Sequence, residues 1–123
     1  MNRATLQIPT VPPSFNAVGY RSHWAVGRKH KLQWQGWLAL ALMEQKVPRR
    51  LKSVSATATL RFKQRRRRDE INFATILNKA LGDALVEGGW LADDTPDLYR
   101  FGAVELFAPV DRPETIVVLD YER

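Results

Sequence analysis

The apolar residues of this chain follow two different periods, and each period predicts a type of secondary structure. In two long segments, 31–46 and 70–87, apolar residues recur every three or four positions, which is typical of an amphipathic helix. The first segment has this spacing at Trp34, Trp37, Leu38, Ala41 and Leu42. The second has it at Phe73, Leu77, Ala80 and Ala84, with Leu81 and Leu85 beside them. We expect both apolar faces to pack on a sheet, and Trp34 and Trp37 to serve packing in the core or in a dimer.

Residues with strong local preferences mark the ends of the two predicted helices. Pro48 ends the first helix, because a proline lacks the amide donor that a helix interior needs. Asp69 is placed to cap the second helix, and Gly88 and Gly89 are placed to end it. Residues 12–28, which are rich in proline and glycine, are expected to form a long loop.

Four shorter segments alternate apolar and polar residues, which predicts strands. These segments are 5–8, 54–62, 99–108 and 114–120, and the last two are separated by a turn at Pro109, Asp111 and Pro113. The resulting β-α-β-α-β-β order predicts an α+β (mixed α/β) fold, a small mixed sheet with two helices packed on it. A chain of 123 residues is expected to form one domain, 1–123.

Composition narrows the choice of partner. The formal net charge is +6 and the pI is near 10.1, which favours a polyanionic partner. The longest apolar run, 37–43, has seven residues, far fewer than the roughly 20 of a membrane-spanning helix. Residues 1–5 lack the apolar core of a secretory signal. We therefore expect a cytoplasmic protein with no membrane association.

The residue types that are missing limit the choice of metal. The chain has no cysteine, and its two histidines, His23 and His30, lie in one basic stretch and cannot complete a zinc site alone. Any metal would be held mainly by oxygen, which suits Mg²⁺, with Mn²⁺ as a substitute.

Charged residues of both signs are concentrated in two places. Arg65, Arg66, Arg67 and Arg68 run directly into Asp69 and Glu70, and a second acidic cluster follows at Asp93, Asp94 and Asp97. Like charges at close range repel, so such clusters indicate bound phosphates and a bound cation. If the second cluster folds back toward the start of the second helix, Asp69 and Asp94 would share one metal. The pattern predicts a metal-dependent site that acts on nucleic acid.

Several of these residues also have a plain structural interpretation. Asn72, Lys79 and Asp83 lie within about 40° of one another on the second helix. They form either part of the site or a solvated face with a Lys79–Asp83 ion pair worth a few tenths of a kcal/mol. The arginine run is either a phosphate-binding strip or a solvated strand end. The basic residues Arg28, Lys29 and Lys31 likewise belong to a phosphate contact or to ordinary surface.

Three blocks of this sequence together form a recognisable pattern. They are Arg65-Arg66-Arg67-Arg68-Asp69-Glu70-Ile71-Asn72, Lys79-Ala80-Leu81-Gly82-Asp83-Ala84-Leu85 and Gly89-Trp90-Leu91-Ala92-Asp93-Asp94. In this order they resemble the RusA family of Holliday junction resolvases. Pro12-Pro13-Ser14 with Asn16 is similar to the opening loop of that family. The family consists of small homodimeric endonucleases, often encoded by prophages, that use magnesium to cut four-way DNA junctions in recombination and repair.

The resemblance implies roles for individual residues. Asp69 and Asp94 would bind the metal, Lys79 would be the essential basic residue on the helix, and Asp83 would be a further acidic position. Asp93 would assist the metal site, and Asn16 would contact nucleic acid. The family usually has a second Asp where this chain has Ile71, so Glu70 would stand in as a ligand.

The sequence therefore leaves two functional classes. The first is a magnesium-dependent structure-specific endonuclease that hydrolyses phosphodiester bonds in branched DNA. The second is a catalytically impaired DNA-binding or regulatory module that keeps the fold while Ile71 removes a metal ligand. An RNA-acting nuclease is a third possibility that composition leaves open.

Overall fold

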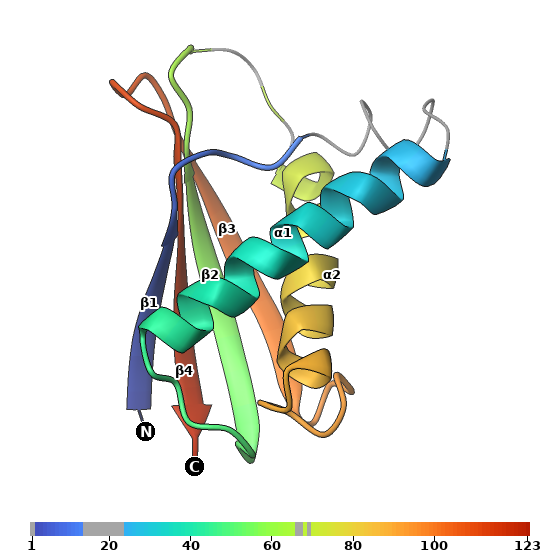
Figure 1. Ribbon diagram of the computed structural model, residues 1–123. Helices are drawn as coiled ribbons and strands as arrows, with labels where there is room; N and C mark the ends of the chain where they lie inside the picture. The colour runs from blue at the N-terminus through green and yellow to red at the C-terminus, as the bar shows by residue number, and fades with distance from the viewer. Residues whose placement is uncertain (1, 14–23, 66–67, 69) are drawn as a thin grey trace.

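The structure is a computed structural model that describes residues 2–13, 24–65, 68 and 70–123, without the side chains of residues 24–26 and 70–72. It contains the six elements that the sequence predicts, in the predicted order (Figure 1). The elements are β1 (Asn2–Ile8), α1 (Trp24–Glu44), β2 (Ser53–Arg61), α2 (Glu70–Glu87), β3 (Tyr99–Phe107) and β4 (Glu114–Glu122).

The four strands form one mixed sheet in the order β1-β4-β2-β3. Strand β4 is antiparallel to both β1 and β2, and β3 is parallel to β2. β1 and β2 therefore run in the same direction, and each is followed by a helix that crosses over the sheet. Right-handed crossovers place both helices on one face, as Figure 1 shows. This arrangement confirms the predicted fold class.

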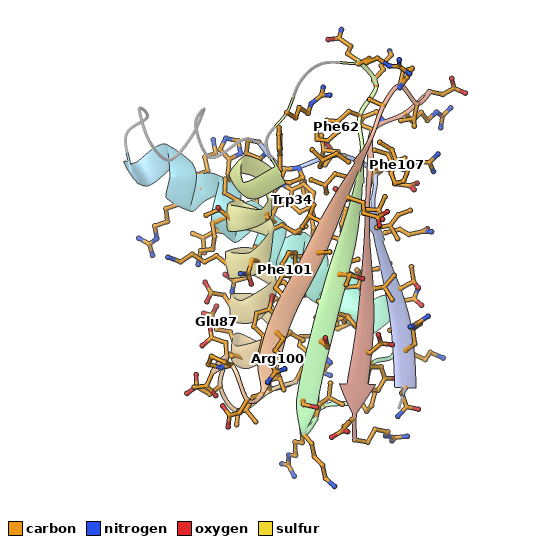
Figure 2. The ribbon with its side chains drawn as sticks, turned by 180° about the vertical axis from the view of Figure 1, so that it is seen from behind. Trp34, Phe62, Glu87, Arg100, Phe101 and Phe107 are labelled. Atoms are coloured by element: carbon orange, nitrogen blue, oxygen red, sulfur yellow. The ribbon has the colours of Figure 1, made fainter. Side chains whose placement is uncertain are left out.

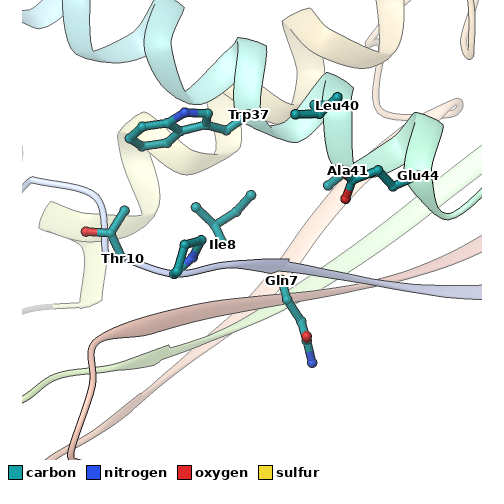
Figure 3. A pocket seen from close by; sticks show the side chains of 8 residues that line it. Gln7, Ile8, Thr10, Trp37, Leu40, Ala41 and Glu44 are labelled. Carbon is teal, nitrogen blue, oxygen red and sulfur yellow. The ribbon is translucent and has the colours of Figure 1, made fainter.

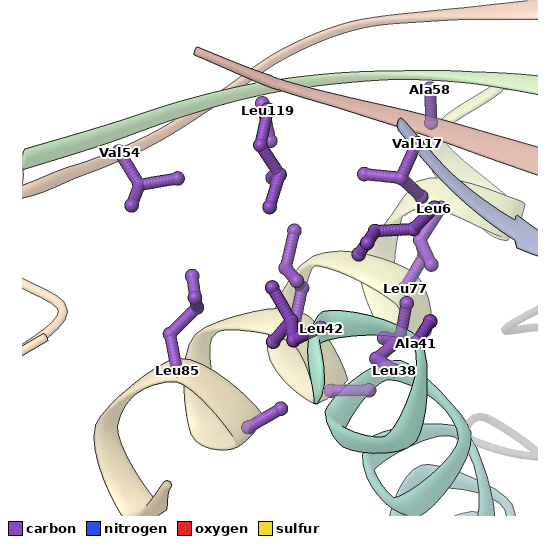
Figure 4. Close-up of a cluster of buried hydrophobic side chains, with 14 of the residues drawn as sticks. Leu6, Leu38, Ala41, Leu42, Val54, Ala58, Leu77, Leu85, Val117 and Leu119 are labelled. Carbon is purple, nitrogen blue, oxygen red and sulfur yellow. The ribbon is translucent and has the colours of Figure 1, made fainter. Parts of the chain in front are cut away.

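The core lies between the helices and the covered face of the sheet (Figure 4). Alternate strand residues point into it, because successive side chains of a strand face opposite sides. The predicted apolar face of α2 is confirmed, since Leu77, Ala80, Leu81 and Leu85 are fully buried. Within the described part of the chain, no helix has both the length and the apolar character that crossing a bilayer requires.

Two elements start several residues earlier than their sequence patterns indicate. Helix α1 begins at Trp24, so residues 24–28, predicted as loop, are helical. No proline occurs in that stretch, and one glycine, Gly27, is tolerated in a helix. Strand β1 begins at Asn2 because Asn2 pairs with Tyr121 of β4, a long-range partner that alternation within β1 does not reveal.

The glycine pair after α2 fixes the direction of the loop that follows. Gly89 has φ +79°, a left-handed conformation that favours glycine. A Cβ on Gly88 would lie only 2.1 Å from the indole of Trp90, so this position requires glycine. Trp90 is buried, and its Nε1 donates a hydrogen bond to the carbonyl oxygen of Val47 at 3.0 Å. The predicted helix end is confirmed, and it anchors the start of the loop that carries Asp94.

The pairing of β2 with β3 contains a bulge. Ala56 pairs with Phe101, but Ala58 pairs with Val104, so β3 has one extra residue between these pairs. Without that residue the next side chain on the same face as Phe101 would be Ala103. With it, both Phe101 and Val104 turn toward the helices, and this re-aiming is a known effect of bulges.

Candidate functional site

A polar pocket lies between α2 and β3, and we call it the α2–β3 pocket. Its volume is about 460 Å³, and it is lined by Thr75, Asn78, Lys79, Asp94, Tyr99 and Phe101. The first three residues come from α2, Asp94 comes from the loop after it, and the last two come from β3. Figure 2 shows Phe101 between β3 and α2. The pocket unites two predicted site residues, Lys79 and Asp94, from distant parts of the sequence.

Gly82 allows the loop and β3 to approach α2 closely. A Cβ on Gly82 would lie 3.3 Å from Cε2 of Tyr99 and 3.4 Å from Oδ2 of Asp94. The contact with Tyr99 is tighter than ordinary van der Waals packing, and the contact with Asp94 lies at the lower limit of ordinary packing. A side chain larger than a methyl group at this position would push both groups outward, so Gly82 favours the close approach of Asp94 and Tyr99 to the helix.

Tyr99 connects β3 to the helix through its hydroxyl group. The hydroxyl donates a hydrogen bond to Oδ1 of Asn78 at 2.8 Å and lies 3.2 Å from the carbonyl oxygen of the same residue. Burial of the phenol, followed by the nearby negative charge of Asp94, raises the pKa of Tyr99. The hydroxyl therefore keeps its proton and remains a donor at physiological pH.

The other carboxylates of the acidic loop are satisfied by the loop itself. Oδ1 of Asp93 accepts a hydrogen bond from the backbone N–H of Asp94 at 2.7 Å. The hydroxyl of Thr95 donates to Asp97 at 2.6 Å, and this bond lowers the pKa of Asp97. The three acids of the cluster therefore differ in their surroundings. Only Asp94 among the three lines the α2–β3 pocket.

The predicted metal ligands are not all brought together. Within the described ranges, no group of three or more Asp, Glu or His side chains could surround a metal ion. Glu70 begins α2, and Gly82, beside Asp94, lies twelve residues further along, which is roughly 18 Å of helix. The helix thus separates Glu70 from Asp94. Asp69 lies outside the described residues, so its sharing of a magnesium or manganese ion with Asp94 stays a prediction.

Asp83 and Lys31 contact each other across the two helices. Nζ of Lys31 lies 2.7 Å from Oδ2 of Asp83, and it also donates to Oε1 of Gln35 at 3.3 Å. Packing of α1 on α2 thus gives Asp83 a partner on the other helix in place of the Lys79 expected from helical spacing. Gln35 further donates a hydrogen bond to Glu87. Asp83, predicted as a catalytic acid, and Lys31, predicted as a phosphate contact, join the helices, and neither is among the described residues that line the pocket.

The basic residues predicted to bind nucleic acid differ in exposure. The guanidinium of Arg68 lies 3.9 Å from the ring centroid of Phe62, and its NH1 donates to the carbonyl oxygen of Gln64 at 2.9 Å. These contacts show that the guanidinium of Arg68 packs on neighbouring residues of its own segment. Arg65, Arg28 and Lys29 are exposed. Arg66, Arg67 and Asn16 lie outside the described residues.

A second pocket lies between α1 and the end of β1, and we call it the α1–β1 pocket (Figure 3). Its volume is about 500 Å³, and it is lined by Gln7, Ile8, Pro9, Thr10, Trp37, Leu40, Ala41 and Glu44. Trp37 packs edge-to-face on the buried Trp34, with ring centroids 5.3 Å apart. The predicted core role of Trp34 is confirmed, and Trp37 is half-buried at the pocket wall.

Sequence reasoning missed four residues that line the α2–β3 pocket and one, Gly82, that lies beside it. They are Thr75, Asn78, Gly82, Tyr99 and Phe101. A signal existed for the first three, because with Lys79 they occupy positions i, i+3, i+4 and i+7 of one helix face. For Tyr99 and Phe101 no local signal existed, since their placement depends on the parallel pairing of β3 and on its bulge.

Comparisons with known proteins give little further information. No protein-family model matches the chain, and no curated protein matches it. A crystal structure of the hydrogenase maturation protein HypE is similar over 98% of this chain and 30% of that chain, with 10% sequence identity and a TM-score of 0.37. A similarity this weak supports no conclusion about fold or function.

Proposed function

We propose that the protein is a metal-dependent endonuclease that hydrolyses phosphodiester bonds of branched DNA, with the α2–β3 pocket as its reaction site. The observation that carries the proposal is the meeting of Lys79 and Asp94 in one pocket. The RusA-like motifs predict a basic residue on a helix and an acidic residue on a later loop as functional residues, and Lys79 and Asp94 are these two residues.

The chemistry of the pocket suits a phosphodiester. Its hydrolysis requires neutralisation of charge on the phosphoryl oxygens and an in-line water. Lys79 supplies a positive charge for those oxygens. Asp94 supplies a carboxylate for Mg²⁺ or Mn²⁺, and Mg²⁺ is usually held by only one or two carboxylates together with waters and substrate phosphates. A bound magnesium ion would lower the pKa of water and polarise the phosphoryl group.

The surface outside the pocket supports a nucleic-acid substrate. The chain carries a formal charge of +6, and Arg28, Lys29 and Arg65 are exposed. Contacts of such residues with phosphates give affinity without reading base sequence. We further propose a homodimer acting in the cytoplasm, because a two-fold assembly matches the symmetry of a four-way junction and would cut it twice.

The test is incubation of a labelled four-way DNA junction with the protein and Mg²⁺, with a chelator in a parallel reaction. We expect paired symmetric nicks that disappear with the chelator and with Asp94→Asn. Asp111→Asn, which changes an exposed acid in the β3–β4 turn, is the matched control and should retain cleavage. Nicks that persist in Asp94→Asn would exclude the α2–β3 pocket as the reaction site.

The second candidate is a DNA-binding module without catalysis. Two observations favour it. This chain has Ile71 at a position where the RusA family, which its motifs resemble, usually has an Asp. In addition, the described residues contain no group of three metal-binding side chains. Tight junction binding without nicks at any Mg²⁺ or Mn²⁺ concentration would support this candidate. Competition between the DNA junction and a structured RNA decides whether RNA is the substrate.

A further inference from the structure

We propose that Asn78 is a second phosphate-binding residue of the α2–β3 pocket and that the hydroxyl of Tyr99 holds it in the binding orientation. In this arrangement the amide N–H groups of Asn78 and the ammonium of Lys79 bind the two non-bridging oxygens of one phosphodiester. The identity of the substrate rests on the proposed function, but the roles of Asn78 and Tyr99 go beyond it.

The direction of the Asn78 amide follows from its hydrogen bond. Oδ1 of Asn78 accepts the proton of Tyr99 at 2.8 Å. A carboxamide is planar and has one acceptor oxygen and an NH₂ group with two donors. The hydrogen bond from Tyr99 therefore occupies the oxygen and leaves the two N–H donors of Asn78, which lines the pocket, available to a ligand. Asparagine N–H groups are common phosphate contacts in complexes with nucleic acids.

Tyr99 is well placed to hold this orientation. The residue is 8% exposed, and its ring lies against the bare position at Gly82. Its position at the start of β3 ties it to β2 through the Val54–Tyr99 pair. A donor that is held before the ligand arrives loses little conformational entropy on binding. Through Tyr99 the sheet thus fixes the orientation of the Asn78 side chain on the exposed surface of the helix.

The charges around Asn78 explain why a neutral donor is useful there. Lys79 follows it directly in α2, and Asp94 faces the same pocket. A phosphate bound by Lys79 alone would lie in the same pocket as the carboxylate of Asp94, and the two negative charges would repel each other. Two N–H donors from Asn78 would hold the second oxygen without adding charge, and they would leave Asp94 available for a cation.

A simpler interpretation makes a different prediction. A buried tyrosine hydroxyl needs a hydrogen-bond partner, and Asn78 meets that need whatever the pocket binds. If this were its whole role, loss of the hydroxyl would lower stability and leave phosphate binding unchanged. Binding must therefore be measured separately from stability.

The probe is thymidylyl-thymidine, a dinucleoside with a single phosphodiester, titrated into the ¹⁵N-labelled protein in the presence and absence of Mg²⁺. We expect the side-chain amide signals of Asn78 to shift with the probe and not with thymidine, which lacks the phosphate. Tyr99→Phe should weaken binding of the probe about 3- to 10-fold, as expected for one hydrogen bond. Asn78→Asp, which replaces donors by a negative charge, should weaken it by more than about 10-fold.

Matched controls separate this effect from a general loss of structure. Tyr121→Phe removes a hydroxyl from β4, outside the residues that line the pocket, and Asn2→Asp adds the same charge on β1; both should bind the probe as the wild type does. Asn78 is exposed, so Asn78→Ala gives a folded variant in which the expected loss can be measured if Tyr99→Phe is unstable. Unmoved Asn78 signals, or wild-type affinity in both Asn78 variants, would overturn the inference.

The junction assay distinguishes failure of this inference from failure of the proposed function. If the wild type cuts junctions and the Asn78 and Tyr99 variants cut equally well with unchanged KM, the inference is wrong and the endonuclease proposal stands. If the probe binds in an Asn78-dependent way but no junction is cut, the phosphate site stands and the endonuclease proposal fails.

Discussion

Two pockets in the described part of the chain, the α1–β1 pocket and the α2–β3 pocket, have nearly the same volume and very different chemistry. The α1–β1 pocket, at about 500 Å³, is walled by Ile8, Trp37 and Leu40 with one acid, Glu44. The α2–β3 pocket, at about 460 Å³, brings Lys79 and Asp94 together. Converging polar groups indicate a site more strongly than size does. The slightly smaller pocket is therefore the better candidate.

The difference arises from how each pocket is built. The α1–β1 pocket lies where β1, an edge strand, ends and α1 crosses it, and its walls combine apolar side chains with the separate polar groups of Gln7, Thr10 and Glu44. The α2–β3 pocket lies inside a parallel β-α-β unit, where the loop after the helix returns to the sheet. Such returns bring residues distant in sequence together, and they are frequent places for functional groups.

The largest expected difference between the two pockets is in how a substitution in each one changes the rate of DNA cleavage. We expect Lys79→Ala to lower kcat on a four-way junction by roughly 100-fold or more, the usual cost of removing a group that stabilises charge in the transition state. Glu44→Gln, in the other pocket, should leave kcat unchanged. Single-turnover cleavage measures both. Equal losses in the two variants would remove the distinction between the pockets.

The next effect concerns stability. Trp37→Ala removes a half-buried indole and its edge-to-face contact with Trp34, and it should lower the free energy of unfolding by about 2–3 kcal/mol. Urea denaturation measures this change, and junction affinity should stay at the wild-type level. A folded Trp37→Ala protein that no longer binds DNA would make the α1–β1 pocket part of the nucleic-acid surface.

A pH-dependent effect follows from Tyr99. An unfolded tyrosine loses its proton near pH 10, whereas the raised pKa of Tyr99 keeps the proton on in the folded state. The native state then binds more protons than the unfolded state, so stability is complete below about pH 10 and falls as the pH rises above it. Relative to Tyr99→Phe, the wild type should lose up to about 1.4 kcal/mol per pH unit. Denaturation between pH 9 and 11 checks this, and parallel curves for the two proteins would contradict it.

The smallest effect concerns the contact between the helices. Lys31→Met and Asp83→Asn should each lower the free energy of unfolding by about 1 kcal/mol, because the pair is only partly shielded from water. A double-mutant cycle should give a favourable coupling energy of the same size. Junction cleavage should be nearly unchanged in both variants. A 100-fold loss of cleavage in Asp83→Asn would return Asp83 to the catalytic residues.

The fold was more predictable from the sequence than the site was. Element types and order follow from local periods, and the end of α2 follows from Gly88 and Gly89, whose requirements are local. The partner of Asp83 depends instead on how α1 crosses α2. The neighbours of Asp94 depend on a loop return and on the bare position at Gly82. Such contacts join segments far apart in the chain, and no periodicity encodes them.

The bulge in β3 also offsets the two halves of that strand by one residue. In an uninterrupted strand, a one-residue slip would turn every side chain to the opposite face. The extra residue between Phe101 and Val104 shifts this alternation by one position. Tyr99 and Phe101 before the bulge and Val104 after it therefore all face the helices. Deletion of one residue from this part of β3 would turn either the Tyr99 end or the Val104 end of the strand to the opposite face of the sheet.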